Sequence, residues 1–361
     1  MSKYLQYLYF FGRPFGLCYG LAMRIREKLY QKGILHQYSL PVPVISVGNL
    51  VMGGTGKTPT VRYLANLLVL QGYQPAIISR GYRGKAKQRV NVVSDRKTIF
   101  LSPELAGDEP YMLAESLPGV PVLTGTRRIY PCLHAIENFQ ADVLLLDDGF
   151  QHLAVQRDID IVLFDGTSLA GNQRVFPGGT LREPVSALGR CDAFLLTGIR
   201  EQNKDNARKF AAFLTAKFPE KTVFYATTSK LSIQCPDKHI SSGAVPEEPI
   251  FAFCGIANPY RFEESLKNIG IRLNGFLALP DHVNYTQETM VDICEKALAS
   301  GAKRLVTTKK DFVKLQKINS QLVCYVTEIE FHGDADFDLF VINAVKTSEK
   351  EKTRLDDLRV Q

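Results

Sequence analysis

The residues with the clearest chemical potential form a glycine-rich run near the N-terminus. The run reads Val51, Met52, Gly53, Gly54, Thr55, Gly56, Lys57 and Thr58. An apolar stretch typical of a strand (42–47) precedes it, and a helical pattern follows it. In this context the glycines let backbone N–H groups converge on phosphate oxygens, Lys57 supplies a positive charge, and the Thr58 hydroxyl can bind Mg²⁺. We therefore predict that residues 51–58 bind the phosphates of a nucleotide.

The run departs from the usual P-loop pattern at one position, because Val51 stands where that pattern has glycine. The alternative interpretation is a glycine-rich turn that binds no phosphate. The Gly-Lys-Thr sequence at the start of the predicted helix favours the phosphate site.

A second run, residues 143–152, is apolar at first and then carries Asp147 and Asp148. Its pattern is typical of a central parallel strand, and acids at the carboxyl end of such a strand lie where open α/β sheets bind ligands. An aspartate at this place is the expected Mg²⁺ partner of a P-loop. The alternative is an aspartate that caps the following turn. Adjacent side chains on extended backbone point in opposite directions, so both carboxylates need not contact one metal ion.

Strand and helix patterns alternate along the chain, which predicts an α/β fold with a P-loop NTPase-like, mostly parallel sheet flanked by helices. A second, smaller α/β domain and an N-terminal membrane-associated helix complete the expected architecture. The expected parts are a membrane-interface segment (1–32), a nucleotide-binding domain (33–225), a smaller domain that completes the cleft (226–345) and a charged tail (346–361). Residues 200–248 are more polar and have a linker-like composition.

The N-terminus combines aromatic and basic residues. Residues 1–40 contain six Lys or Arg against one acidic residue, and the segment 12–14 (Gly-Arg-Pro) interrupts the apolar run. The charge follows the apolar stretch, unlike in a signal peptide, and the interrupted run is too short to span a bilayer. We expect this segment to lie in the interface of an anionic membrane surface. The alternative is an amphipathic helix packed on the protein's own core.

Composition supports a sizeable protein of two domains, with 361 residues and 45% hydrophobic content. The net charge of +7 is moderate, and we expect neither a nucleic-acid partner nor an obligate protein partner. Seven cysteines with no C-x-x-C spacing indicate reduced thiols rather than a disulfide framework or a zinc site.

Several motifs together resemble the tetraacyldisaccharide 4'-kinase family of lipid A biosynthesis, in that family's order from about residue 1 to about 330. They are Gly48-Asn49, residues 53–59, Ser79-Arg80-Gly81-Tyr82, Gly107-Asp108-Glu109-Pro110, Asp147-Asp148-Gly149-Phe150-Gln151-His152, Leu181-Arg182-Glu183-Pro184, Gly255-Ile256-Ala257-Asn258-Pro259, Asp281-His282 and Thr307-Thr308-Lys309-Lys310-Asp311. The resemblance implies that ATP and Mg²⁺ are used to phosphorylate the 4'-hydroxyl of a lipid-linked glucosamine disaccharide 1-phosphate, which gives lipid IVA. It also implies a location at the cytoplasmic face of the inner membrane of a Gram-negative bacterium.

The resemblance pairs Asp108 with His282 as a base, with the acid orienting the imidazole and favouring its protonated form. Lys57 and Mg²⁺ held by Thr58 and Asp147 or Asp148 are expected to neutralise the phosphates, and Arg128 is a candidate for stabilising transition-state charge. Further candidate substrate-binding residues are Glu109, Gln151, Arg182 and Glu183. Two positions depart from the family pattern: Val283 follows His282 where a second histidine is common, and Ala257 replaces a commoner glycine.

Two other classes of function compete with the kinase. A P-loop ATPase or GTPase switch at the membrane would hydrolyse nucleotide without an acceptor, but the sequence has no Asn-Lys-x-Asp base-reading motif. A non-catalytic membrane adaptor would keep the aromatic N-terminus without needing Lys57 or the paired carboxylates.

Overall fold

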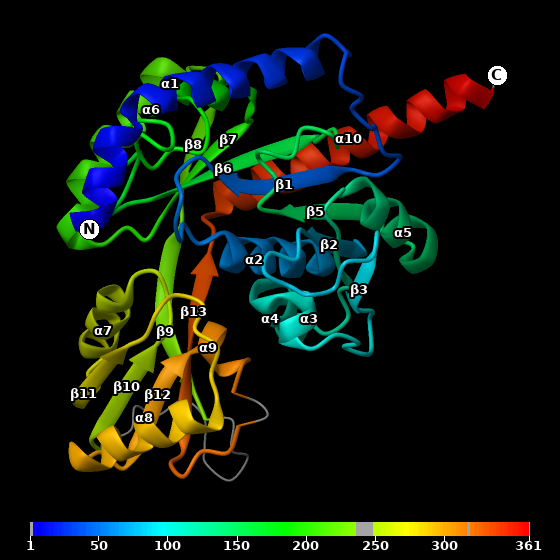
Figure 1. The fold of residues 1–361 in the computed structure, drawn as a ribbon. Helices are drawn as coiled ribbons and strands as arrows, with labels where there is room; N and C mark the ends of the chain where they lie inside the picture. Colours follow the sequence, from blue (N-terminus) through cyan, green and yellow to red (C-terminus); the bar gives the residue numbers. More distant parts are fainter. Residues whose placement is uncertain (1–2, 236–247, 316–317, 361) are drawn as a thin grey trace.

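The computed structural model describes residues 3–235, 248–315 and 318–360 (Figure 1). Its larger sheet has eight strands in the order β3-β4-β2-β5-β1-β6-β7-β8, and only β3 runs antiparallel to its neighbour. The strands are β1 (Val44–Asn49), β2 (Pro75–Ser79), β3 (Asn91–Ser94), β4 (Val122–Thr124), β5 (Val143–Asp147), β6 (Ile159–Asp165), β7 (Ala193–Thr197) and β8 (Thr222–Tyr225). The predicted mostly parallel sheet is thus confirmed.

Helices cover both faces of this sheet, so the central strands β1, β5 and β6 are buried along their whole length. On one face lie α2 (Lys57–Leu70), α4 (Asp108–Ser116) and α10 (Ala335–Val360). The other face is covered by α5 (Ile129–Phe139), by α6 (Lys204–Lys217) and by the 3-10 helix η1 (Val185–Arg190). The short helices α3 (Pro103–Ala106) and η2 (Glu201–Asn203) lie in the connections.

The smaller sheet has the order β11-β10-β12-β13-β9 and is parallel except for β9. Its strands are β9 (Thr227–Gln234), β10 (Ile250–Cys254), β11 (Leu273–Ala278), β12 (Arg304–Thr308) and β13 (Cys324–His332). Helix α7 (Pro259–Asn268) packs on one face and α8 (Gln287–Ala299) on the other, while α9 (Lys309–Phe312) follows β12. The polar segment 200–248, expected to be linker-like, therefore contributes α6, β8 and β9, while residues 236–247 lie outside the described residues.

The C-terminal boundary differs from the prediction. Helix α10 runs without interruption from Ala335 to Val360, whereas the sequence predicted a domain that ends at residue 345 and a separate tail. Its residues Phe337, Val341 and Val345 are buried in the core of the larger sheet. In Figure 1 the helix leaves the end of β13 and returns along that sheet. The reason is that apolar side chains on one helical face need a partner surface, and the larger sheet supplies it.

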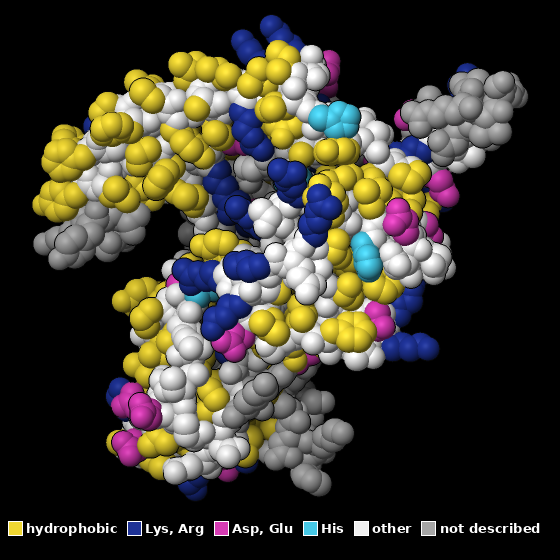
Figure 2. All heavy atoms as spheres, turned by 45° about the vertical axis from the view of Figure 1, so that its right-hand side comes forward, with side chains coloured by type: hydrophobic (Ala, Val, Ile, Leu, Met, Phe, Trp, Pro, Cys, Tyr) yellow, Lys and Arg dark blue, Asp and Glu magenta, His cyan; other side chains and the backbone are white. Residues whose placement is uncertain are grey.

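The N-terminal helix α1 (Lys3–Gln31) is continuous and contains Pro14, so the interruption of the apolar run at residues 12–14 does not interrupt the helix. Gly12 and Gly16 face the segment 175–178, and a Cβ at either position would lie within 2.8 Å of a backbone oxygen of that segment. This close approach seats the helix on the protein with its larger side chains turned outward. Figure 2 shows those hydrophobic side chains along the outer surface of α1. No described helix is both long enough and apolar enough to cross a membrane.

All seven cysteines are free thiols, as the sequence predicted. Burial raises the pKa of the Cys132 thiol to about 12, and burial with the charge of Asp311 does the same for Cys254. Because thiolates are the reactive form, these buried cysteines are packing residues rather than nucleophiles.

Candidate active site

The glycine-rich run connects β1 to α2, the context that a phosphate-binding loop requires. Gly53 and Gly56 have left-handed backbone, with φ of +124° and +82°. A Cβ on Gly53 or Gly54 would meet no atom within 4 Å, so the loop borders open space. The loop is fixed from behind, because the Thr55 hydroxyl accepts a hydrogen bond of 3.0 Å from Asn49 Nδ2. The start of α2 is therefore both rigid and accessible to an anion.

Val51 fits its place because its side chain turns away from the loop. It is buried with Leu50 and Phe150, and its backbone bridges to Leu181. The next residue, Met52, donates its N–H to the carbonyl of Thr180 at 2.8 Å. The segment 180–182 thus braces the side of the loop that usually begins with glycine.

Asp147 and Asp148, at the carboxyl end of β5, lie in different surroundings. Asp147 is 1% exposed, and burial, with the negative charges of Glu109 and Asp148, raises its pKa to about 7. Its Oδ2 lies 3.4 Å from the hydroxyl of Ser79, whereas no donor among the described residues reaches its buried Oδ1. An orphaned carboxylate oxygen of this kind is a suitable ligand for a hard divalent cation.

Asp148 has left-handed backbone (φ +51°), which aims its side chain toward the loop. Lys57 Nζ lies 3.6 Å from its Oδ1, and Arg182 Nη1 lies 2.8 Å from both carboxylate oxygens. Burial raises the pKa of this carboxyl, but the two cations outweigh burial and hold it below the usual value. Asp148 is therefore ionised at neutral pH.

Arg128 stands directly before α5 and is 5% exposed. Its Nη2 lies 3.4 Å from the carbonyl oxygen of Asp147 and 3.3 Å from that of Asp148, so it braces the carboxylate turn. Burial lowers its pKa below the usual value, while the two aspartates oppose that shift. Within the described chain its Nε has no hydrogen-bond partner, which leaves one donor direction for an anion.

A cleft of about 410 Å³ opens beside these residues and beneath α1. Its basic lining consists of Arg26, Arg80, Arg128 and Arg182, and its apolar lining includes Met23 and Phe176. Asp148, Gln151 and Glu183 also line it. Figure 2 shows Lys and Arg side chains gathered in the hollow below the hydrophobic arch of α1. A cleft that is cationic at its base and apolar at its rim suits a phosphorylated amphiphile.

The predicted substrate-binding residues differ in how many contacts they already make with other protein groups. Gln151 donates from Nε2 to the carbonyl of Asn49 at 2.9 Å. Glu183 is buried and paired with Arg190, whose guanidinium lies 4.0 Å from the Phe150 ring centroid. Arg190 also lies 3.5 Å from Glu27 of α1. Glu183 thus anchors α1 to the site, which favours a structural role for it over direct contact with substrate.

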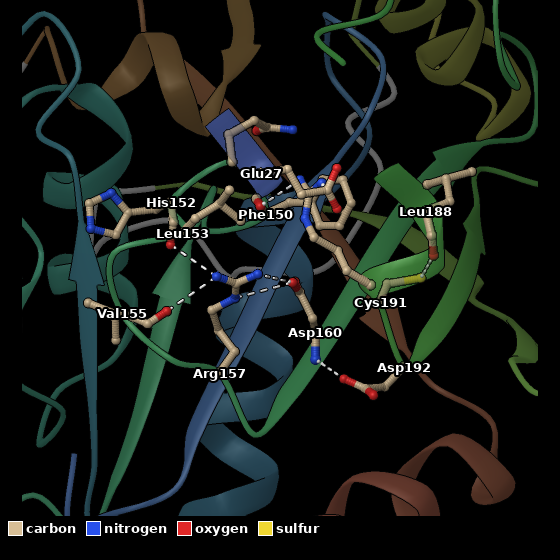
Figure 3. Close-up of polar contacts among 12 residues, drawn as sticks. Glu27, Phe150, His152, Leu153, Val155, Arg157, Asp160, Leu188, Cys191 and Asp192 are labelled. Carbon is tan, nitrogen blue, oxygen red and sulfur yellow. Dashed lines mark hydrogen bonds and ion pairs between the residues drawn. The ribbon is translucent and has the colours of Figure 1, made fainter. Parts of the chain in front are cut away.

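Arg157 holds the turn that carries Gln151 and His152, a role that no sequence motif indicated. It pairs with Asp160 at 2.8 Å and donates to the carbonyls of His152 and Val155 at 3.2 Å (Figure 3). The backbone N–H of Asp160 in turn donates to Asp192 Oδ2 at 2.7 Å. Half-buried His152 has its pKa lowered to about 3 by loss of hydration and by neighbouring arginines, so it is neutral in the cleft.

Asp108 and His282 meet between the two sheets, as the resemblance implied. Asp108 opens α4, and His282 lies in the loop after β11, with 3.0 Å between His282 Nδ1 and Asp108 Oδ2. His282 has φ of +60°, a strained conformation for a non-glycine residue that is typical of functional sites. Glu109, next on α4, lies near enough to Asp147 for its charge to act there.

A buried carboxylate organises the loop that carries His282. Asp311 is fully buried, and its Oδ2 accepts from the N–H of Gly255 at 3.0 Å and from the Thr308 hydroxyl at 2.7 Å. The carbonyl of Gly255 then accepts the N–H of His282 at 3.1 Å. The sequence shows the motifs of Gly255, His282 and Asp311 separately. Their contacts could not be predicted from it, because they join three loops that follow different strands.

Comparison with known proteins places this site in a family. A family model described as tetraacyldisaccharide-1-P 4'-kinase matches residues 8–346. The chain belongs to the tetraacyldisaccharide-1-P 4'-kinase family. A tetraacyldisaccharide 4'-kinase from Desulfotalea psychrophila is 46% identical over 337 residues, which cover 93% of this chain and 96% of the relative. One from Pelobacter propionicus is 40% identical over 307 residues, covering 84% and 82%.

A solved structure agrees with the fold. The crystal structure of LpxK from Aquifex aeolicus in complex with ATP superposes with a TM-score of 0.73 at 32% identity. The match covers 92% of this chain and 98% of that chain.

The departure at Val283 has a packing reason in this member of the tetraacyldisaccharide-1-P 4'-kinase family. Val283 packs with the apolar core of the smaller sheet, and its Cγ1 lies 2.5 Å from where a Cβ on Gly255 would be. Gly255 and Val283 therefore fit as a pair. Of positions 282 and 283, only His282 faces Asp108.

We predict that Gly255→Ala destabilises the protein by about 1–3 kcal/mol, because the added methyl group overlaps Val283 and pushes against the loop of His282. Urea unfolding measures the change. Gly189→Ala is the matched control, since its Cβ would meet no atom within 4 Å. Val283→Ala in the Gly255→Ala background should restore part of the loss; an unrescued double variant would contradict the pairing.

Proposed function

We propose that this chain transfers the γ-phosphoryl group of ATP to the 4'-hydroxyl of a tetraacyl glucosamine-disaccharide 1-phosphate, giving lipid IVA in lipid A biosynthesis. The observation that carries the proposal is the ion pair of Lys57 and Asp148 at the start of α2, in a chain matched by the family model over residues 8–346. The ATP complex of the Aquifex aeolicus structure supports ATP as the phosphoryl donor.

The phosphate-binding residues act by positioning and by neutralising charge. The loop 51–58 and the start of α2 present N–H groups to the β- and γ-phosphates, and Lys57 exchanges its contact with Asp148 for a phosphate oxygen. Arg128 offers its unpartnered Nε to charge that develops on the transferring group. These groups are preorganised, so little reorganisation is needed when the reaction occurs.

The residues around the carboxylates fit a magnesium ion. The orphaned Oδ1 of Asp147, the Asp148 carboxylate and the Thr58 hydroxyl are hard oxygen donors near the phosphate loop. We propose that these three residues hold Mg²⁺, which when bound neutralises charge on the phosphates. A metal-bound Asp147 is ionised, since a cation removes the penalty that burial imposes on its charge.

The acceptor hydroxyl is a weak nucleophile and gains from a positioned base. We assign this role to Asp108 and His282 acting as a unit, because their contact joins the nucleotide-binding part to the smaller domain. Gln151 and Arg182, and Glu109 from α4, are proposed to orient the disaccharide within the cationic cleft. Glu183 supports them by anchoring Arg190.

Helix α1 is proposed to lie in the interface of the anionic inner-membrane surface, at its cytoplasmic face, as a peripheral or monotopic anchor. Its outward side chains include Phe11, Phe15 and Leu17, which are 68%, 66% and 80% exposed. Exposed apolar residues in such a row are rare on a protein surface unless they meet a partner or a membrane. The acyl chains of the acceptor can then remain in the bilayer while its disaccharide enters the cleft beneath α1.

Lys57→Ala should lower acceptor-dependent turnover by about 10²–10³-fold, because it removes the cation that meets the phosphates. Release of ADP and formation of the phosphorylated lipid measure this loss. Lys85→Ala is the matched control, since Lys85 is exposed and forms an ion pair with Glu104 at the protein surface. ATP hydrolysis by the unchanged protein without any lipid acceptor would favour a nucleotide switch instead.

Asp108→Asn and His282→Gln should each reduce kcat strongly, with little change in the KM for ATP. The double variant should cost far less than the product of the single losses, because groups that act as a unit are non-additive. Steady-state kinetics at saturating lipid acceptor provide the comparison. Multiplicative losses would remove the pair as a joint base.

Replacing Phe11, Phe15 and Leu17 together by serine should shift the protein from anionic phospholipid vesicles to the soluble fraction in a sedimentation assay. The change removes apolar contacts with the interface and leaves the glycine face of α1 intact. A control triple variant carries serine at Leu70, Tyr260 and Leu298, which are large exposed hydrophobic residues on other parts of the surface. Equal binding of both triple variants would place the membrane contact on another surface.

A further inference from the structure

Two lysines bracket the Asp108–His282 pair. Lys314 Nζ lies 2.9 Å from Asp108 Oδ2, and Lys310 Nζ lies 3.1 Å from His282 Nε2. Both lysines lie shortly after β12: Lys310 belongs to the Thr307–Asp311 motif, and Lys314 lies three residues beyond it. The mechanism above assigns this motif no role beyond the buried anchor Asp311.

Both lysines are largely withdrawn from water. The side chain of Lys314 is 9% exposed and that of Lys310 is 21% exposed. A buried ammonium group loses hydration and is stable only when specific acceptors replace the water. Lys314 finds Asp108 and the carbonyl of Val283 at 3.3 Å, while Lys310 finds His282 and Asp281, whose Oδ1 lies at 3.4 Å.

The contact of Lys310 with His282 selects one protonation state. A lysine ammonium group can only donate, so Nε2 of His282 must accept with its lone pair. The ring proton then resides on Nδ1, from which it is donated to Asp108 Oδ2. This arrangement is a neutral imidazole, whereas the resemblance led us to expect that the pair favours the protonated form.

Asp108 Oδ2 receives two donors, the ring N–H of His282 and the ammonium group of Lys314. These donors fix the plane of the carboxylate. The second oxygen, Oδ1, is then the one that can take a proton from an acceptor hydroxyl.

We propose that Lys314 and Lys310 are positioning residues of the kinase, which hold His282 as a neutral Nδ1–H donor and Asp108 as an ionised acceptor. This inference rests on the proposed function. In the step, the O–H bond of the 4'-hydroxyl breaks and its proton moves to Asp108 Oδ1. The hydroxyl oxygen keeps the electron pair and bonds to the γ-phosphorus, whose bond to ADP breaks with the electrons leaving on ADP. The proton later passes from Asp108 to solvent.

The chain contains a matched control for this role. Lys309, adjacent to Lys310 on α9, pairs with Glu115 of α4 at 2.5 Å. This ion pair also joins the two parts of the protein, but it does not touch Asp108 or His282. If the lysines merely held the parts together, loss of Lys309 would have the same effect as loss of Lys310 or Lys314.

The other groups facing the pair stay unchanged in every variant. Asp281 Oδ1 lies 3.9 Å from His282 Nε2, and the Tyr82 ring centroid lies 6.3 Å from that of His282. Because Lys310→Met also removes the cation beside Asp281, the effect on the Asp108–His282 pair is the one that Lys310→Met shares with Lys314→Met.

The kinetic test uses the full-length protein with Lys314→Met, Lys310→Met and Lys309→Met. Methionine keeps the apolar stem of the side chain and removes the charge. We expect kcat to fall about tenfold or more in the first two variants, since small displacements of reacting groups cost this much. The KM for ATP should stay within about twofold. Lys314→Arg should recover part of the loss, and Lys309→Met should retain nearly full activity.

The structural test does not depend on turnover. Nitrogen-15 NMR of ring-labelled histidine distinguishes an Nδ1–H from an Nε2–H imidazole, and His282→Gln identifies the signal among the six histidines. The unchanged protein should show the Nδ1–H form of His282, and Lys310→Met should shift it toward the doubly protonated form, because Nδ1–H still faces Asp108 while Nε2 no longer faces a cation. Thermal unfolding confirms that each variant is folded.

Three results separate the hypotheses. An Nε2–H or doubly protonated His282 in the unchanged protein overturns the inference, as do Lys314→Met and Lys310→Met enzymes with the activity of Lys309→Met. If the unchanged protein shows the Nδ1–H form but phosphorylates no lipid acceptor, the proposed function fails while the assigned protonation state stands.

Discussion

The ion pair between Lys57 and Asp148 is the contact on which the rest of the site depends. It joins the phosphate loop after β1 to the carboxylate turn after β5, two neighbouring parallel strands of one sheet. Arg182 binds the same carboxylate and brings in the segment that also braces Val51 and Met52. That segment closely follows residues 175–178, which lie against Gly12 and Gly16 of α1, so one stretch of chain connects the nucleotide site with this helix.

The smaller domain completes this arrangement through contacts on two sides. Asp108 meets His282 and Lys314 on one side, and Asp165 pairs with Arg261 of α7 on the other. The chain crosses between the sheets at β9 and β13, and Arg62 of the phosphate-loop helix pairs there with Glu328. Helix α10 then returns to the larger sheet. There the Tyr63 hydroxyl of α2 donates to Asp338 of α10 at 2.7 Å, which links α2 to the chain that leaves β13. The nucleotide helix and the connecting strands are thus packed as one unit.

Local patterns predicted much of the nucleotide-binding part, because parallel strands buried on both faces read as uninterrupted apolar runs. The runs before Gly53 and before Asp147 are examples, and both became central strands. The boundary at α10 was not predicted correctly. The charged residues of 346–360 predicted a tail separate from the smaller domain, whereas they continue a helix that Phe337 anchors on the larger sheet.

The sequence by itself determined the loop chemistry and the identity of the acids and cations, because those properties belong to residue types at short spacing. It also contained the pair Asp108 and His282, although only a family resemblance joined them. The tertiary structure decided which charges meet: Lys57 with Asp148, Glu183 with Arg190, and Lys310 with His282. Such contacts are made between residues distant in the chain, and their energies depend on burial and geometry that no local pattern encodes.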